Sequence, residues 1–162
     1  MLVKAAQGNP RWEIAERCAI GEARGLTKIN ISGFSGSSSL RSMNDTHLKA
    51  APTTGYVGTE DCEIYRIDDI GRRYIKPDDR VLLKIDTQGY EKNVLDGATG
   101  IMDQVVAMQI EVALVELYEG ETLALDLIRS VLDQGFSVFA FCNGFGEKTG
   151  RLLQADVFFI RT

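Results

Sequence analysis

Apolar and polar residues alternate in two early segments of the chain, residues 26–32 (LTKINIS) and 62–67 (CEIYRI). This period of two predicts strands that have one face in solvent. A further strand is predicted over residues 12–20 (WEIAERCAI), which holds β-compatible residues and stops at a glycine. Residues 33–58 are rich in serine and glycine and have little periodicity. A loop of this length in a small domain is usually functional or disordered.

After residue 80 the pattern changes to strand, helix, strand. Residues 81–85 (VLLKI) predict a strand, and residues 90–102 place their apolar side chains on one face of a helix. Residues 105–112 (VVAMQIEV) form a nearly continuous apolar strand, which is typical of a parallel sheet covered on both faces. We therefore expect these two strands to be parallel neighbours joined by a right-handed crossover.

An amphipathic helix is predicted over residues 121–134, with Gly135 as its left-handed cap. Two more strands, residues 136–142 and 155–162, flank a loop rich in turn residues and so predict an antiparallel hairpin. With 162 residues and 44% hydrophobic content, the chain has enough apolar material for one compact core. The elements together predict one α/β domain over residues 1–162, whose parallel sheet ends in an antiparallel pair.

The composition excludes several classes of protein. The formal net charge of −5 argues against a nucleic-acid partner, which would require a basic face. The sequence begins without a secretion signal and polar residues interrupt its apolar run at residues 105–117, so we expect a cytoplasmic protein outside the membrane. Three widely spaced cysteines without a CxxC pair predict reduced thiols. Because His47 is the only histidine, we expect neither a zinc site nor a Ser-His-Asp triad.

Candidate chemistry lies where two apolar strands end, at Asp86 and Glu111. Ligands of parallel α/β sheets bind beyond the carboxyl ends of the strands. Adjacent strands are about 4.8 Å apart, so the two carboxylates can converge as a base and an orienting group and raise each other's pKa. Two other interpretations remain open. Asp86 can instead cap the helix that begins near Gly89. Glu111 can be solvated separately or pair with Lys84 or Arg129.

Several segments occur in an order, and with residues, that are found together in a known family. They are ERCAIGE, SGSSSL, YRIDDI, LLKIDTQGYEKNVLDGA, VVAMQIEV and TGRLLQADVFF. With these segments the chain closely resembles the FkbM family of S-adenosylmethionine-dependent methyltransferases over nearly its whole length. The resemblance implies a class I methyltransferase fold, in which a Rossmann-like, mostly parallel sheet carries an antiparallel C-terminal strand. It also implies methyl transfer from S-adenosylmethionine to a hydroxyl group of a small molecule or sugar.

The positions of individual residues, taken together with the resemblance, indicate roles for several of them. Asp86 would face the sulfonium or amino group of the cofactor, and with Glu111 it would form the catalytic pair. Gly21, Ser38 and Gly89 would join Asp86 in binding the cofactor. Ser38 belongs to a run of serines that is either a lid over the cofactor or a mobile linker. Two candidate carboxylate ligands are too few for a magnesium site, so we assign no metal.

The chain differs from the family at its start. Family members begin with a strand, a glycine-rich turn, a helix and a second strand whose final acidic residue holds the cofactor ribose; this sequence has neither strand. We therefore expect an N-terminally incomplete domain that binds S-adenosylmethionine weakly and is inactive alone. The missing strands would lie between residues 12–20 and 81–85, so strand edges are expected to be exposed and to pair with a second copy or a partner chain. A non-catalytic module that binds a partner or self-associates is the alternative function.

Overall fold

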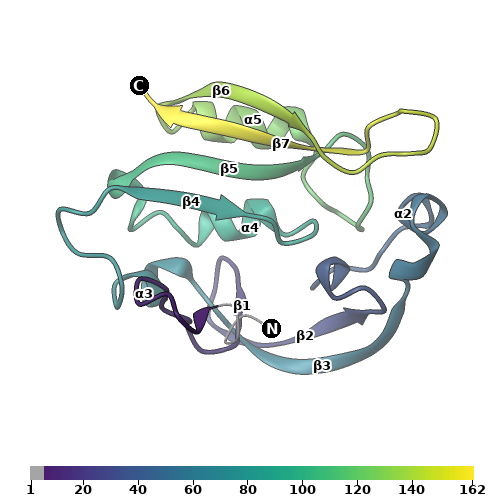
Figure 1. Ribbon diagram of the computed structural model, residues 1–162, viewed down its shortest axis with the longest axis horizontal. Coiled ribbons are helices and arrows are strands. Elements are labelled where there is room, and N and C mark those ends of the chain that lie inside the picture. Colours follow the sequence, from purple (N-terminus) through teal and green to yellow (C-terminus); the bar gives the residue numbers. More distant parts are fainter. Residues whose placement is uncertain (1–5) are drawn as a thin grey trace.

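The computed structural model describes residues 6–162, whose strands form two sheets (Figure 1). The smaller sheet has the order β1-β3-β2 and contains β1 (Ala19–Ile20), β2 (Gly25–Ser32) and β3 (Tyr56–Tyr65). β2 and β3 are antiparallel along their length, and β1 joins β3 in parallel at its two residues. The two alternating strands predicted in this part of the chain are therefore confirmed, although β3 begins earlier than the alternation indicated.

The strand predicted over residues 12–20 is mostly absent, because only its last two residues belong to β1. Residues 7–17 are exposed and join neither sheet, and the exposed fraction of Trp12 is 54%. The prediction was wrong because this segment has too few apolar residues, interspersed with charged ones such as Glu13 and Arg17, to bury one face against another element.

The serine-rich segment that lacked periodicity is built of short helices. It contains η1 (Ser35–Ser37), α2 (Asp45–Ala50) and η2 (Pro52–Thr54) before β3 begins. Its ends are tied together, because Ser32 Oγ donates to the Thr54 carbonyl oxygen at 2.5 Å and the main chains of Asn30 and Ser39 exchange two hydrogen bonds. Bonds between side chains and main chain order this segment, so a search for hydrophobic periodicity does not find it.

The larger sheet has the order β4-β5-β7-β6. β4 (Val81–Ile85) and β5 (Val105–Ala113) are parallel neighbours, which confirms the predicted pair. They are joined by α4 (Glu91–Asp96) and, after a series of turns, by η3 (Met102–Gln104). α4 is shorter than the helix predicted over residues 90–102 because two glycines, Gly97 and Gly100, follow it and weaken helix formation.

The rest of the larger sheet is antiparallel. α5 (Ala124–Leu132) follows β5, and Gly135 after it has a φ of 83°, which confirms the predicted left-handed residue. β6 (Phe136–Asn143) and β7 (Gln154–Arg161) form the predicted hairpin, and β7 also pairs with β5 in the antiparallel sense. The expectation of a mostly parallel sheet is wrong. The sheet is mixed because the hairpin places the C-terminal strand between β5 and β6, where it makes both antiparallel pairs.

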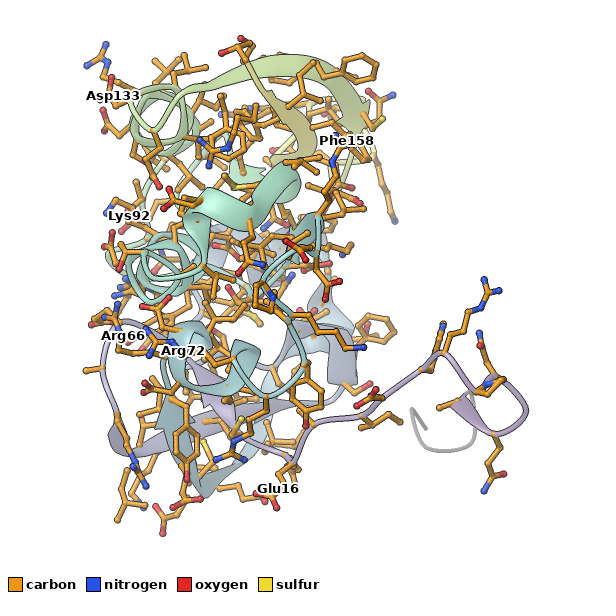
Figure 2. The ribbon with its side chains drawn as sticks, turned by 90° about the vertical axis from the view of Figure 1, so that its left-hand side faces the viewer. Glu16, Arg66, Arg72, Lys92, Asp133 and Phe158 are labelled. Atoms are coloured by element: carbon orange, nitrogen blue, oxygen red, sulfur yellow. The ribbon has the colours of Figure 1, made fainter. Side chains whose placement is uncertain are left out.

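α4 and α5 lie on one face of the larger sheet and form the main core with it (Figure 1). Its most buried side chains include Ile85, Leu95, Met108, Ile110 and Leu127. Figure 2 shows Phe158 on the side of the sheet away from Lys92 of α4 and Asp133 at the end of α5. Leu82 of β4 has an exposed fraction of 63%. The helices therefore cover one face of the sheet rather than both. Among residues 6–162, no helix combines the length and apolar character needed to cross a membrane.

Gly97 marks the point where α4 touches the loop after β1. A Cβ atom on Gly97 would lie 2.0 Å from the carbonyl oxygen of Gly21. We expect Gly97→Ala to lower the free energy of unfolding by roughly 1–3 kcal/mol, the usual effect of overpacking. Gly25→Ala is the matched control, because its Cβ atom would meet nothing within 4 Å. Urea denaturation compares the two variants, and equal stability would contradict the close contact.

Candidate functional site

Asp86 lies just beyond the carboxyl end of β4, and Glu111 lies near the carboxyl end of the parallel strand β5. Asp86 directly follows β4, and Glu111 follows Ile110, the residue opposite Ile85. The side-chain amide of Gln88 joins them, because its Nε2 donates to Asp86 Oδ1 and to Glu111 Oε2, both at 2.9 Å. The two carboxylates therefore converge, through a shared amide rather than by direct contact.

Gln88 lies in the tight turn between β4 and α4. Its φ of 56° and the φ of 90° at Gly89 are both in the left-handed region. A Cβ atom on Gly89 would lie 2.7 Å from Cβ of Tyr118, so only glycine fits there. Ser39 Oγ donates to the Gln88 carbonyl oxygen at 2.6 Å, and the Tyr118 hydroxyl donates to Gln88 Oε1 at 2.8 Å. Contacts from two distant segments thus hold Gln88 in a conformation that is unfavourable for a non-glycine residue.

Arg41 fixes the same turn from the other side. Its Nε donates to the Gly89 carbonyl oxygen at 2.7 Å. Its two terminal nitrogens donate to the Glu119 carbonyl oxygen at 2.9 Å and to Asn93 Oδ1 at 3.0 Å. The guanidinium group also lies over the ring of Tyr90, 5.3 Å from its centroid. One cation thus connects the turn with α4 and with the loop that follows β5.

Asp86 does not cap α4, so this alternative is wrong. The helix has no side-chain cap at its first position, and the carboxylate of Asp86 pairs instead with Lys84 Nζ at 2.9 Å. Glu91 stabilises the turn, because its Oε1 accepts the main-chain N–H groups of Thr87 and Gly89 at 2.8 and 3.3 Å. Burial raises the pKa of Glu91 above its usual value. The side chain of Asp86, by contrast, is 39% exposed and accessible to a ligand.

Glu111 is a second carboxyl group of the site whose pKa is raised. Burial, together with the charges of Asp86, Glu91 and Asp156, raises the pKa of Glu111 to about 8. A second amide, from Gln154, donates to Oε2 at 2.9 Å, the same oxygen that accepts the first amide. No donor among residues 6–162 reaches Oε1, and this atom is not sealed from solvent. Glu111 is therefore largely protonated at neutral pH and has one free oxygen.

Two clefts meet at this group of side chains. The first cleft, of about 240 Å³, lies between β1 and the end of β4, and its lining includes Ile20, Ser38, Leu40, Asp86 and Tyr90. The second cleft, of about 370 Å³, lies between the serine-rich segment and the loop that joins β6 to β7, and its lining includes Gln88, Glu111 and Gln154. Asp86 belongs to the first cleft and Glu111 to the second. The amide of Gln88 spans the boundary between them.

Comparison with known families places this geometry in context. The family described as Methyltransferase FkbM domain matches residues 4–138, most of the chain, including Asp86 and Glu111. The chain belongs to the FkbM methyltransferase family. No curated protein and no solved structure matches the chain. Family membership makes the chain a methyltransferase by resemblance, and both carboxylates of the site lie within the matched region.

Three further residues of this FkbM domain were predicted to bind the cofactor. Ser38 lines the first cleft, and its Oγ accepts the N–H of the last residue of β2 at 3.1 Å, which ties the run of serines to the sheet. Gly21 is buried and is not part of the lining, although a Cβ atom on it would approach the ring of the lining residue Tyr90 to 2.9 Å. Gly89 packs inside the turn and is not part of the lining. Ser38 is therefore the one of the three that faces the first cleft.

Gln88, Gln154 and Tyr118 of this FkbM domain were not predicted from the sequence. Gln88 offered a signal, since it is an amide between two acidic residues in the turn DTQGYE. Gln154 is 43 residues from Glu111, and Tyr118 is 30 residues from Gln88, so neither contact is visible in the local sequence. The sheet pairing that brings Gln154 to Glu111 becomes apparent only once β7 is placed beside β5.

The raised pKa of Glu111 predicts a pH-dependent stability. In the unfolded chain this carboxyl group loses its proton near 4.5, and in the folded protein near 8. Its contribution to stability is therefore fully present below about pH 4.5 and is lost as the pH rises to about 8. Glu111→Gln retains the shape and an acceptor for both amides. It should raise Tm more at about pH 8.5 than at about pH 5.5, by several degrees, since 1 kcal/mol corresponds to roughly 2–4 °C at this size.

Scanning calorimetry across this pH range measures the difference. Glu119→Gln, at an exposed position in the loop after β5, is the control and should leave Tm nearly unchanged at every pH. A Tm difference between wild type and Glu111→Gln that does not vary with pH would show that Glu111 titrates alike in the folded and unfolded states.

Proposed function

We propose that this chain transfers a methyl group from S-adenosylmethionine to a hydroxyl group of a small molecule or sugar. The observation that carries the proposal is the pair of carboxylates bridged by the Gln88 amide where two clefts meet. A reaction between two bound molecules needs adjacent sites, alignment and a group that takes up a proton at their junction. Membership of the FkbM family supports methyl transfer as the reaction.

The first cleft suits the charged end of the cofactor. Asp86 supplies a carboxylate, which would attract a sulfonium or ammonium cation, and Ser38 supplies a hydroxyl group beside it. When bound, the cofactor provides a methyl group that is already activated by the positive sulfur. The charge of Asp86 is partly neutralised by Lys84 at 2.9 Å. We therefore expect residues 1–162 to bind the cofactor weakly, with a Kd above about 100 µM.

The second cleft would hold the acceptor, with Glu111 as its general base. In the ionised form of Glu111, Oε1 has no protein partner, so it can accept the proton of an acceptor hydroxyl as the hydroxyl oxygen takes up the methyl group from the sulfur. A pKa of about 8 suits this role, because a base works best when its pKa lies near the working pH. The two amides that donate to Oε2 restrict the orientation of the carboxyl group and leave Oε1 without a protein partner.

The pairing of Lys84 with Asp86 predicts opposite effects for two substitutions. Asp86→Asn removes the negative charge and should weaken S-adenosylmethionine binding about fivefold to tenfold. Lys84→Met releases the carboxylate and should strengthen binding by about threefold. S-adenosylhomocysteine lacks the sulfonium charge but keeps the ammonium group, so an unchanged affinity in both variants would place the sulfonium at Asp86, and a parallel change would place the ammonium group there. Isothermal titration provides the four comparisons, and effects of the same sign for both variants would contradict a cation held by Asp86.

Methyl transfer is tested with isotopically labelled S-adenosylmethionine at millimolar concentration and a panel of phenols, polyols and sugars. We expect methyl ethers to form, as detected by mass spectrometry. Glu111→Gln should lower the rate about 10²- to 10⁴-fold, the usual contribution of a general base. Glu119→Gln is the control and should retain the rate. An unchanged rate in Glu111→Gln would show that Glu111 is not the general base. Transfer only to amines or thiols would show that the acceptor is not a hydroxyl group.

One observation favours a second candidate function, self-association through a strand edge. β4 pairs with β5 on one side, and no strand of residues 6–162 pairs with its other side. Leu82 on this strand is 63% exposed. Unpaired edges with exposed apolar side chains recruit further strands. Light scattering checks this function: a dimer that forms with rising concentration, and that Leu82→Lys abolishes, would support it, whereas a monomer at all concentrations would exclude it.

A further inference from the structure

The second cleft has aromatic walls that come from three separate segments. Phe34 follows β2, His47 lies on α2, and Phe145 lies in the loop between β6 and β7. Figure 1 shows α2 and this loop at the same end of the molecule. The polar side chains that line the cleft include Gln88, Glu111 and Gln154. A cleft with flat apolar walls and a few convergent polar groups is the usual form of a site for a small ring compound.

His47 lines the second cleft, and its ring nitrogens have no hydrogen-bond partner among residues 6–162. Its side chain is only 3% exposed, and its ring stacks on Phe145 and meets Tyr118 edge-on, with both centroid distances 5.2 Å. Nδ1 is the one buried side-chain nitrogen or oxygen of residues 6–162 that has no hydrogen-bond partner. Burial lowers the pKa of His47, so the imidazole is neutral. A phenylalanine would fill this position without leaving a polar atom unpaired, so the protein alone does not account for a histidine there.

Nε2, the other ring nitrogen, is the one a ligand can reach. No group within residues 6–162 hydrogen-bonds it, yet it is not sealed as Nδ1 is, and the ring lines the cleft. Glu111 also lines the cleft, and its Oε1 likewise has no protein donor among residues 6–162 and is not sealed from solvent. A neutral imidazole and a carboxyl group each form a hydrogen bond with a hydroxyl group. The cleft therefore offers two separate places for hydroxyl groups.

We propose that this cleft binds the methyl acceptor, and that the acceptor is an uncharged ring compound with two nearby hydroxyl groups, one at Glu111 and one at His47. The proposal rests on the proposed function and specifies its substrate class. The ring lies between the walls formed by Phe34 and Phe145. An anionic acceptor is disfavoured because Asp86 and other carboxylates surround Glu111. His47 is a specificity-determining residue that orients the second hydroxyl group.

The single histidine of the chain gives a direct readout, because its imidazole has one set of NMR signals. Protein labelled with ¹⁵N is titrated, without cofactor, with catechol, phenol, methyl glucopyranoside and benzoate. We expect catechol or methyl glucopyranoside, which carry neighbouring hydroxyl groups, to shift the imidazole signals in a saturable way. If catechol binds, the cleft selects a flat ring. Phenol should then bind roughly five- to tenfold more weakly than catechol, because it lacks one hydrogen bond. If the glucoside is the ligand, a sugar ring is selected, and 2-deoxyglucoside should be weakened by the same factor.

Two variants separate the role of His47 from a general change in structure. His47→Phe keeps the aromatic wall and removes the unpaired nitrogen, so it should fold with an unchanged or higher Tm. In this variant, isothermal titration should give equal affinities for catechol and phenol, or for the glucoside and the 2-deoxyglucoside. Thr46→Ala changes an exposed residue of the same helix that is not part of the cleft lining, and it should retain the wild-type preference.

Three results would overturn the proposal. They are no saturable imidazole shift with either catechol or the glucoside, a shift with benzoate as strong as with these two compounds, or a preference for two hydroxyl groups that survives in His47→Phe. Because the titrations contain no cofactor, these results are independent of the Asp86 and Lys84 titrations with S-adenosylmethionine. Failure of the acceptor cleft and failure of the methyltransferase assignment are thus recognised separately.

Discussion

The geometry of the site depends on one side-chain amide, that of Gln88. Its nitrogen donates to the carboxylates of Asp86 and Glu111, and its oxygen accepts from the hydroxyl group of Tyr118. The nitrogen uses both of its hydrogens in this way, which leaves the amide one orientation. To place the amide between two strand ends, the chain adopts a left-handed φ at Gln88 and needs glycine at the next position. Ser39 and Arg41 hold that turn from both sides.

The same amide allows several acidic groups to share a small volume. Glu111 lies near Asp86, Glu91 and Asp156, and burial deprives it of water. Without donors, such a carboxyl group would be strongly unfavourable, and the amides of Gln88 and Gln154 supply donors without introducing a second charge. The carboxyl group of Glu111 is therefore largely protonated at neutral pH and loses its proton at a slightly higher pH. Perturbed carboxyl groups at the junction of two clefts are typical of active sites, which is why this one carries the functional proposal.

The sequence predicts the part of the fold in which hydrophobic periodicity determines structure. The parallel pair of β4 and β5, the hairpin of β6 and β7 and the left-handed Gly135 all follow from patterns within a few residues. The mostly parallel sheet was wrong because the order of strands depends on where the hairpin docks, which periodicity does not encode. The strand over residues 12–20 was wrong because β-compatible residues do not form a strand without a surface on which to pack.

The candidate site was predictable only in its charged members. Asp86 and Glu111 could be placed at strand ends because both follow apolar runs of clear length. The groups that orient them are neutral amides and a tyrosine from distant parts of the chain, and their roles depend on tertiary contacts. The structure also replaced one interpretation with another, because Glu91 rather than Asp86 stabilises the turn before α4.

The titration of Glu111 tests the account most directly. In protein labelled with ¹³C in the glutamate side-chain carboxyl groups, the Glu111 signal is identified by its absence from Glu111→Gln. Its chemical shift should change with a midpoint at about pH 8. In Gln88→Met, which removes the shared amide, the midpoint should move higher still, because the ionised form loses a donor. A Glu111 signal that titrates near its usual value of 4.5 would contradict the account, because the carboxyl group would then be neither buried nor coupled to its acidic neighbours.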